Sequence, residues 1–144
     1  MALRYGHSND LPLRRRILLV EDEPFVREAT CLMLERAGFE VLAAEDAREA
    51  MKVYEQSNSG IDLVMTDMIL PGRSGEELGE DLRRCSPEVS VLVTSGYSDA
   101  EREVEAPARR TYFLAKPYSR VALLDKLEKI LAAAPLARAA SQAG

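Results

Sequence analysis

Short apolar runs alternate with amphipathic stretches along most of the chain. Five runs are mainly apolar: Ile17 to Val20, Val41 to Ala44, Ile61 to Met65, Val89 to Val93 and Tyr112 to Ala115. Continuous rather than alternating apolarity is typical of strands that are covered on both faces, as in a parallel sheet. The pattern therefore predicts five buried strands.

Helix signals lie between these runs and after the last one. Asp46 and Ser74 are each followed by a glutamate three residues later, which is the spacing of a capping box. The predicted helices begin at about Pro24, Asp46, Ser74 and Ser119, and a weaker, charged helix fits residues 99–105. A strand followed by a helix thus recurs five times. Right-handed crossovers would fold this order into an α/β domain of (βα)5 type, a doubly wound parallel five-stranded sheet with helices on both faces.

Composition and charge suit one globular domain. The chain has 144 residues, of which 47% are hydrophobic and 30% are charged, enough for a single core. Its formal net charge of -5 argues against direct nucleic-acid binding. The basic cluster Arg14 to Arg16 is interpreted as a solvated lead-in to the first strand. We expect a flexible leader over residues 1–15, the domain over 16–132 and a flexible tail over 133–144.

Several functional classes are disfavoured by what the sequence lacks. Cys31 and Cys85 are the two cysteines, and they form neither a disulfide framework nor a metal motif. The sequence has no apolar run near the roughly 18 residues that span a membrane, and its first residues do not resemble a signal peptide. We therefore expect a cytoplasmic protein without a membrane partner.

Polar residues follow four of the five predicted strands directly. Parallel strands bind ligands beyond their carboxyl ends, so these residues should share one rim. The four groups are Glu21-Asp22-Glu23, Thr66-Asp67, Thr94-Ser95-Gly96 and Lys116-Pro117. Each residue alone could be a helix cap, a turn residue or a surface lysine. Unrelated turn residues, however, have no reason to occupy matching strand ends.

Together these groups suit phosphoryl transfer to an aspartate. Crowded carboxylates repel one another, and oxygen ligands favour a hard cation such as Mg²⁺. A carboxylate beside that ion can attack phosphorus and form an aspartyl phosphate. Mg²⁺, a lysine and a hydroxyl can each take one of the three phosphoryl oxygens. Asp67 would therefore have its partners on other strands.

The sequence resembles the receiver domains of two-component response regulators over about residues 16 to 132. The resemblance is carried, in order, by "ILLVEDEP", "DLVMTDMILPGRSGEEL", "VLVTSGYSD" and "FLAKPYS". It implies a flavodoxin-like sheet with strand order 2-1-3-4-5. It also implies that Asp67 is the phosphoacceptor and that Lys116 pairs with the phosphoryl group. The implied Mg²⁺ ligands are Glu21, Asp22, Asp67 and the backbone carbonyl of Ile69.

The resemblance assigns further residues around the acceptor. The switch hydroxyl is ambiguous between Thr94 and Ser95, and we choose Ser95 because the small Gly96 follows it. Phe113 stands where the family carries a switch aromatic, with ordinary core packing as the alternative. The Lys116–Pro117 peptide bond is expected to be cis. Ile69 and Tyr97 should border the path of a water that hydrolyses the aspartyl phosphate.

The resemblance also implies partners. The phosphoryl donor would be a phosphohistidine on a histidine kinase or a histidine phosphotransfer protein. A downstream protein would bind the face made by the fourth helix, the fifth strand and the fifth helix. The motif sequences look most like those of receivers in hybrid histidine kinases, so we expect a stand-alone receiver or a segment of such a kinase. Such a protein is a signalling module and not an enzyme, and it would be a monomer or a weak dimer.

Two rival readings explain less of the sequence. An aspartyl-nucleophile phosphohydrolase of the haloacid dehalogenase type needs an acid two residues after the nucleophile, where this chain has Ile69. A flavin or nucleotide binder of the same fold class would need a glycine-rich loop after the first strand, where "EDEP" would repel phosphate.

Overall fold

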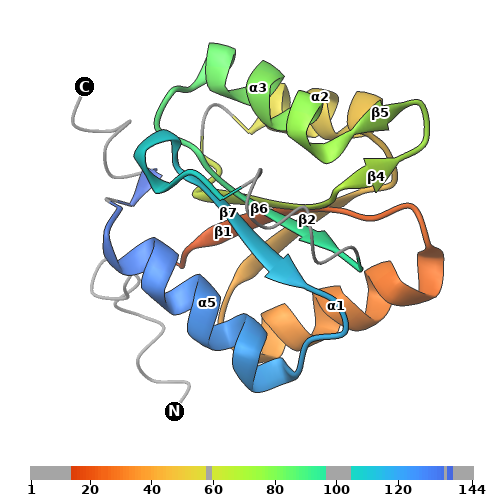
Figure 1. Ribbon diagram of the computed structural model, residues 1–144, viewed down its shortest axis with the longest axis vertical. Helices are drawn as coiled ribbons and strands as arrows, with labels where there is room; N and C mark the ends of the chain where they lie inside the picture. The colour runs from red at the N-terminus through yellow and green to blue at the C-terminus, as the bar shows by residue number, and fades with distance from the viewer. Residues whose placement is uncertain (1–13, 58–59, 97–104, 135, 138–144) are drawn as a thin grey trace, which may run out of the picture.

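The computed structural model describes residues 14–57, 60–96, 105–134 and 136–137 (Figure 1). One parallel sheet has the order β2-β1-β3-β6-β7. Its strands are β1 (Arg16–Val20), β2 (Glu40–Ala44), β3 (Leu63–Asp67), β6 (Ser90–Ser95) and β7 (Thr111–Ala115). The predicted order 2-1-3-4-5 is confirmed, because β4 (Ile69–Leu70) and β5 (Arg73–Ser74) form a separate small hairpin between the third and fourth sheet strands.

Helices cover both faces of the sheet. They are α1 (Pro24–Arg36), α2 (Ala47–Gln56), α3 (Gly75–Cys85) and α5 (Arg120–Ala132), with a short 3₁₀ helix η2 (Pro107–Arg109) before β7. Figure 1 shows α2 and α3 on one face and α1 and α5 on the other. The helix expected over 99–105 lies outside the described residues except for Glu105, as do Tyr97 and most of the expected leader and tail. Every helix in the described part of the chain is too short or too polar to span a bilayer.

The helix caps follow the sequence signals in part. Ser74 forms a full capping box with Glu77, each side chain bonding to the other's backbone N–H. Asp46 accepts from the backbone of Glu49, but the Glu49 carboxylate accepts from Glu45 N instead of Asp46 N, so this capping box is incomplete. After α1, Gly38 takes a positive φ of 103°, a conformation that glycine adopts without a Cβ penalty.

Alternate residues of the inner strands pack into two separate cores. Leu18, Val64, Val91, Val93 and Phe113 face α2 and α3. Their neighbours Ile17, Leu19, Leu63, Met65 and Leu92 face α1 and α5. Because successive side chains of a strand point to opposite faces, this alternation also decides on which face each rim residue lies.

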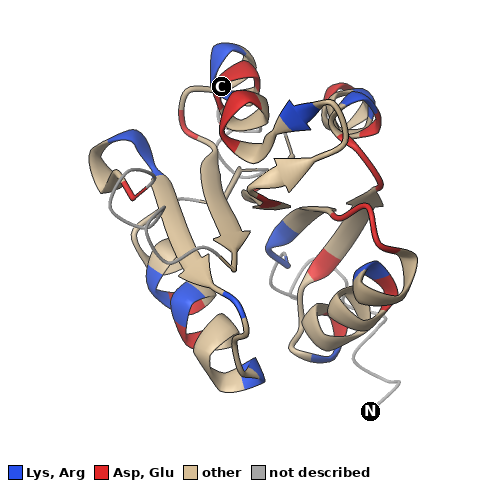
Figure 2. Ribbon diagram, turned by 45° about the vertical axis from the view of Figure 1, so that its right-hand side comes forward, with Lys and Arg blue, Asp and Glu red and all other residues tan. Residues whose placement is uncertain are grey.

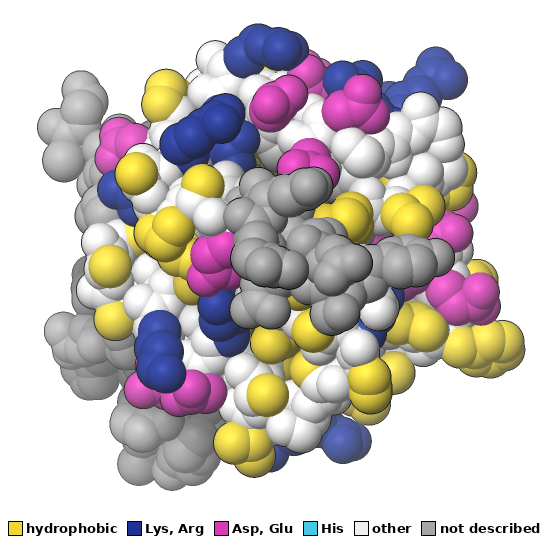
Figure 3. Space-filling view, viewed as in Figure 1, with side chains coloured by type: hydrophobic (Ala, Val, Ile, Leu, Met, Phe, Trp, Pro, Cys, Tyr) yellow, Lys and Arg dark blue, Asp and Glu magenta, His cyan; other side chains and the backbone are white. Residues whose placement is uncertain are grey.

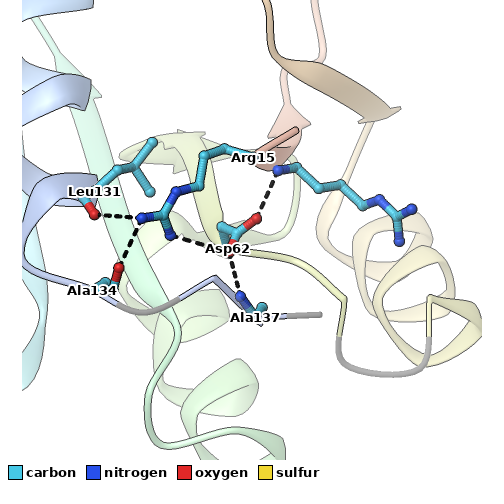
Figure 4. A network of polar contacts seen from close by, with 6 residues as sticks. Arg15, Asp62, Leu131, Ala134 and Ala137 are labelled. Atoms are coloured by element: carbon cyan, nitrogen blue, oxygen red, sulfur yellow. Dashed lines mark hydrogen bonds and ion pairs between the residues drawn. The ribbon is translucent and has the colours of Figure 1, made fainter. Parts of the chain in front are cut away.

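A buried carboxylate ties three chain segments together at the amino edge of the sheet (Figure 4). Asp62 accepts from Arg16 N at 2.7 Å and from Ala137 N at 2.6 Å, and it lies 3.5 Å from the Arg15 guanidinium. Arg15 also donates to the carbonyls of Leu131 and Ala134, beyond which α5 offers no helical N–H. The expectation of a solvated basic cluster is therefore wrong for Arg15 and Arg16, which are half-buried.

Candidate functional site

Strand parity brings four polar side chains to one face at the carboxyl edge. Asp67 continues the alternation of Leu63 and Met65, and Glu21 lies two residues after Leu19, so both lie on the α1 and α5 side. The same alternation puts Thr94 and Lys116 on that side. In Figure 2 the acidic stretch that links β1 to α1 lies at this edge. These four side chains therefore form one site on one side of the sheet, and Ser95 of the predicted rim does not share that side.

Three carboxylates of the rim meet closely. Glu21, Asp22 and Asp67 each offer an oxygen atom, and these atoms lie within 4.8 Å of one another. Glu21 and Asp67 are buried, while Asp22 is exposed. Glu23 is exposed and contributes its backbone N–H to Glu21 Oε2 at 3.1 Å. The donors are all hard oxygens on a partly open rim, so the residues present fit a hydrated Mg²⁺ ion.

The electrostatics of the cluster favour a cation. Burial and the neighbouring Asp67 carboxyl raise the pKa of Glu21 to about 7. Without a cation, one way to relieve the repulsion is for Glu21 to keep its proton near neutral pH. A divalent ion would replace that proton and allow the Glu21 carboxyl to ionise.

Lys116 and Thr94 converge on one oxygen of Asp67. Lys116 Nζ lies 2.5 Å from Asp67 Oδ1, and Thr94 Oγ1 donates to the same oxygen at 3.0 Å. Burial works against the lysine charge, but the Asp67 carboxylate outweighs it and the pKa of Lys116 is raised. The backbone N–H of Lys116 donates to Ser95 O at 2.8 Å, and the Lys116–Pro117 bond is cis, as expected.

The segment after Asp67 is held by backbone bonds. Met68 N donates to Thr94 O at 2.8 Å, and Gly75 N donates to Met68 O at 2.6 Å. The hydrogen bond between Gly75 and Met68 joins the two residues next to the Ile69–Ser74 pair of the β4–β5 hairpin. Hydrogen-bonded and non-hydrogen-bonded pairs alternate along antiparallel strands, so Ile69 and Ser74 form a non-hydrogen-bonded pair. The hairpin itself therefore leaves the carbonyl of Ile69 unused, which suits a metal ligand.

Gly75 was not singled out from the sequence, although it borders the acceptor. A Cβ atom built on Gly75 would come within 2.2 Å of the Asp67 carbonyl oxygen, so α3 can begin there only with glycine. A glycine in the first turn of a helix lowers helix propensity, and that is the signal which could have drawn attention to it.

The expected switch residues lie on the opposite side of the sheet from Asp67. Ser95 ends β6 and Phe113 lies in β7, both are buried, and both share the parity of Val93. The Phe113 ring packs in the core under α2 and α3. Its backbone N–H donates to Glu105 Oε1 at 2.6 Å, and Glu105 Oε2 accepts from Lys126 of α5 at 3.1 Å.

Comparisons with known proteins agree with this site. The family model for the response regulator receiver domain matches residues 17–128. Sensor kinase CckA of Brucella abortus is 30% identical over 125 residues, which cover 86% of this chain and 13% of that protein. The phosphate regulon transcriptional regulatory protein PhoB of Escherichia coli is 33% identical over 124 residues, which cover 83% of this chain and 52% of that protein. The chain thus spans about half the length of PhoB and a small part of CckA.

Solved structures share the fold. A receiver domain from the hybrid histidine kinase CckA has a TM-score of 0.69 at 34% identity, covering 81% of this chain and 98% of that one. The response regulator TrrA from Thermotoga maritima, solved in complex with Mg²⁺-BeF, has a TM-score of 0.71 at 30% identity, covering 81% of this chain and 99% of that one. The family match covers at least part of each of the five strands of the sheet, and the chain belongs to the response regulator receiver domain family, whose members act as phosphoacceptors in two-component signalling.

Proposed function

We propose that Asp67 accepts a phosphoryl group from a phosphohistidine of a kinase or phosphotransfer protein. The observation that carries this proposal is the convergence of Lys116 and Thr94 on an aspartate that also borders two further carboxylates. A carboxylate oxygen of Asp67 would form the bond to phosphorus as the bond from phosphorus to the donor imidazole nitrogen breaks. The leaving nitrogen keeps the electron pair of that bond.

Residues around Asp67 would divide the work of this transfer. Glu21, Asp22, Asp67 and the carbonyl of Ile69 would hold Mg²⁺, which supplies positive charge to the phosphoryl oxygens when bound. Lys116 would move from the carboxylate to a phosphoryl oxygen, a shift that its flexible side chain permits. These roles need no residue that activates a water, so the domain would be a signalling module rather than an enzyme acting on a separate substrate.

We also propose Thr94 as the switch hydroxyl, because Ser95, the choice that the sequence favours, lies on the face of the sheet opposite Asp67. Thr94 is paired in register with Asp67 and already donates to it. A movement of Thr94 toward the phosphoryl group would also displace its neighbour Ser95, which shares the other face with Phe113, and would so change the space beside that ring. This is a local charge change that biases a packed element.

A protein donor fits the surface around the rim. Large exposed side chains follow three strand ends: Phe25 and Val26 after β1, Ile69 after β3, and Val121 after β7. Figure 3 shows hydrophobic side chains gathered over the α1 side of this view. Exposed apolar side chains around an acidic centre suit a protein partner whose surface presents one charged group among apolar side chains.

The remaining proposals concern the chain as a whole. Residues 16–132 would carry the receiver function in the cytoplasm, as a stand-alone receiver or as part of a hybrid kinase, and as a monomer or weak dimer. A downstream protein would bind the expected face of the fourth helix, the fifth strand and the fifth helix, of which β7 and α5 lie in the described part of the chain. The phosphohydrolase alternative is not supported, since Ile69 supplies no general acid.

Phosphorylation in vitro tests the proposal. The protein is incubated with acetyl phosphate and Mg²⁺, and the modified peptide is identified by mass spectrometry. We expect one phosphoryl group on Asp67, its loss in Asp67→Asn, and normal yield in Asp125→Asn, where an exposed carboxylate of α5 is changed. Equal labelling of the parent and Asp67→Asn would refute the assignment.

A further inference from the structure

Arg27 folds back from α1 onto the turn that carries two of the three clustered carboxylates. Its guanidinium Nη1 donates to the backbone carbonyl of Glu21 at 2.8 Å, and its own backbone N–H donates to Glu23 O at 2.8 Å. Arg27 is half-buried, whereas its neighbours Val26 and Glu28 on the helix are exposed. The side chain therefore lies against the turn instead of extending into solvent.

The carbonyl that Arg27 holds belongs to the peptide unit joining Glu21 to Asp22. On its other side, Glu21 is held by the bond from its N–H to Ala44 O at 3.0 Å. The orientation of one peptide plane sets the direction in which the next residue leaves it, because the plane is rigid. Holding the Glu21 carbonyl thus restrains the exposed Asp22. The bond to Ala44 restrains only the peptide unit before Glu21.

We propose that Arg27 is a positioning residue for the metal site: it fixes the Glu21–Asp22 peptide so that both carboxylates face Asp67. This rests on the proposed role of the three carboxylates as Mg²⁺ ligands. Groups that orient metal ligands without touching the metal commonly change metal affinity by about ten- to a hundredfold. Arg27 makes its contact through a backbone carbonyl, so the lower end of that range is expected.

Positioning and simple electrostatics predict opposite results. A guanidinium near three carboxylates opposes a second cation, so removing its charge should strengthen Mg²⁺ binding if charge alone matters. If Arg27 positions the ligands, removing it should weaken Mg²⁺ binding although the site becomes more negative. The sign of the change therefore separates the two explanations.

The experiment measures Mg²⁺ affinity by isothermal titration calorimetry in the full chain. Arg27→Gln should bind Mg²⁺ about tenfold more weakly than the parent. Arg36→Gln is the matched control, because it removes the same charge from an exposed position in the last turn of α1. It should bind within about twofold of the parent, since surface charges interact weakly in salt. Parent-like or tighter binding by Arg27→Gln overturns the proposal.

Two further variants keep the test decisive. Arg27→Lys retains the charge but lacks the planar fork, and we expect it to bind at least about threefold more weakly than the parent. If Arg27→Gln does not fold, as judged by thermal unfolding in EDTA, parent-like binding by Arg27→Lys overturns the proposal.

Asp22→Asn tests the underlying metal site. If Asp22→Asn binds Mg²⁺ as tightly as the parent does, the proposed ligand set fails together with the inference. If Asp22→Asn loses affinity and the Arg27 variants do not, the inference alone fails.

Discussion

Lys116 reaches past a whole strand to bring its Nζ within 2.5 Å of Asp67 Oδ1. Asp67 ends β3 and Lys116 follows β7, and β6 lies between these two strands in the sheet. Thr94, at the end of β6, donates to the same oxygen. Direct contacts therefore link Asp67 to the residue that follows the edge strand β7, which also carries Phe113.

Replacing Lys116 should separate metal binding from phosphorylation. Lys116→Met removes a cation beside the carboxylate cluster, so Mg²⁺ should bind at least as tightly as in the parent. The rate of phosphorylation by acetyl phosphate should fall roughly a hundredfold, because one preorganised donor to the developing charge is lost. Lys129→Met is the matched control, as Lys129 pairs with Asp125 on the exposed side of α5. An unchanged rate in Lys116→Met would show that the lysine is not needed for transfer.

Thr94→Ala and Ser95→Ala should have different effects. Thr94→Ala removes a hydrogen bond to the unphosphorylated acceptor, so we expect a loss of about 1 kcal/mol in unfolding free energy and slower phosphorylation. Thr94→Ala should also reduce the chemical-shift changes of Phe113 when beryllofluoride is added, whereas Ser95→Ala should leave both phosphorylation and those changes close to the parent's. If Ser95→Ala instead suppresses those changes and Thr94→Ala does not, the switch hydroxyl is Ser95.

Strand β3 illustrates what local pattern could predict. The apolar run led to a strand starting at Ile61 and to an acidic residue at its carboxyl end. The end is right, since β3 closes on Asp67. The strand starts two residues later than predicted, at Leu63, and Asp62, inside the predicted run, binds Arg15 and Arg16 through its carboxylate. That contact joins residues far apart in sequence, and a local pattern contains no information about it.

The same limit explains which site residues were missed. The residue types and spacing of Glu21, Asp67 and Lys116 are sufficient to predict a shared rim, because all parallel strands end on one edge. The contact of Arg27 with a carbonyl and the close approach of Gly75 to Asp67 depend on side-chain rotamer and on helix placement. Neither quantity follows from hydrophobic periodicity.

The buried carboxylate of Asp62 should contribute to stability and not to phosphorylation. Asp62→Ala leaves the Arg15 guanidinium and two backbone N–H groups without their acceptor, so we expect a loss of about 3 kcal/mol in the urea unfolding free energy. Glu40→Gln is the control, because Glu40 pairs with Arg16 at a more exposed position and should change stability by less than about 1 kcal/mol. Equal effects of the two variants would argue against a specific role for the Asp62 network.

Glu21 should make the stability of the metal-free protein depend on pH. Its pKa is raised from 4.5 to about 7 by burial and by Asp67. Between pH 4.5 and about 7, Glu21 keeps a proton in the folded chain that it has lost in the unfolded chain. The contribution of that proton to the unfolding free energy is therefore lost as the pH rises through about 7. The unfolding free energy of the parent relative to Glu21→Gln should therefore fall between pH 4.5 and pH 8, by at most about 3 kcal/mol.

Magnesium should oppose this loss. Urea unfolding in EDTA and in saturating Mg²⁺ gives the comparison, since an ion that binds only the folded state adds stability. The gain on adding Mg²⁺ should be larger at pH 8 than at pH 5, where the proton on Glu21 competes with the ion. Parallel pH curves for the parent and Glu21→Gln in EDTA would contradict the raised pKa.

Glu105, which lies two residues before η2, binds both β7 and α5 through its carboxylate. One carboxylate oxygen accepts from Phe113 N, and the other accepts from Lys126. Glu105→Ala would leave an edge-strand amide without its acceptor, so the unfolding free energy should fall by about 1–2 kcal/mol and hydrogen exchange at Phe113 should become faster. Lys126→Met removes only the half-exposed ion pair and should cost less than about 1 kcal/mol.

Glu105 also gives a test of how the acceptor communicates with the proposed partner face. If the two bonds of Glu105 hold β7 in its unphosphorylated position, their removal should ease the movement that phosphorylation causes. In Glu105→Ala without phosphate, the amide signals of β7 and α5 should therefore lie part of the way toward their positions in the beryllofluoride-treated parent. Lys126→Met should show a smaller displacement in the same direction. Displacements confined to α1 and α2, or equal signals in Glu105→Ala and the parent, would mean that Glu105 does not restrain the switch.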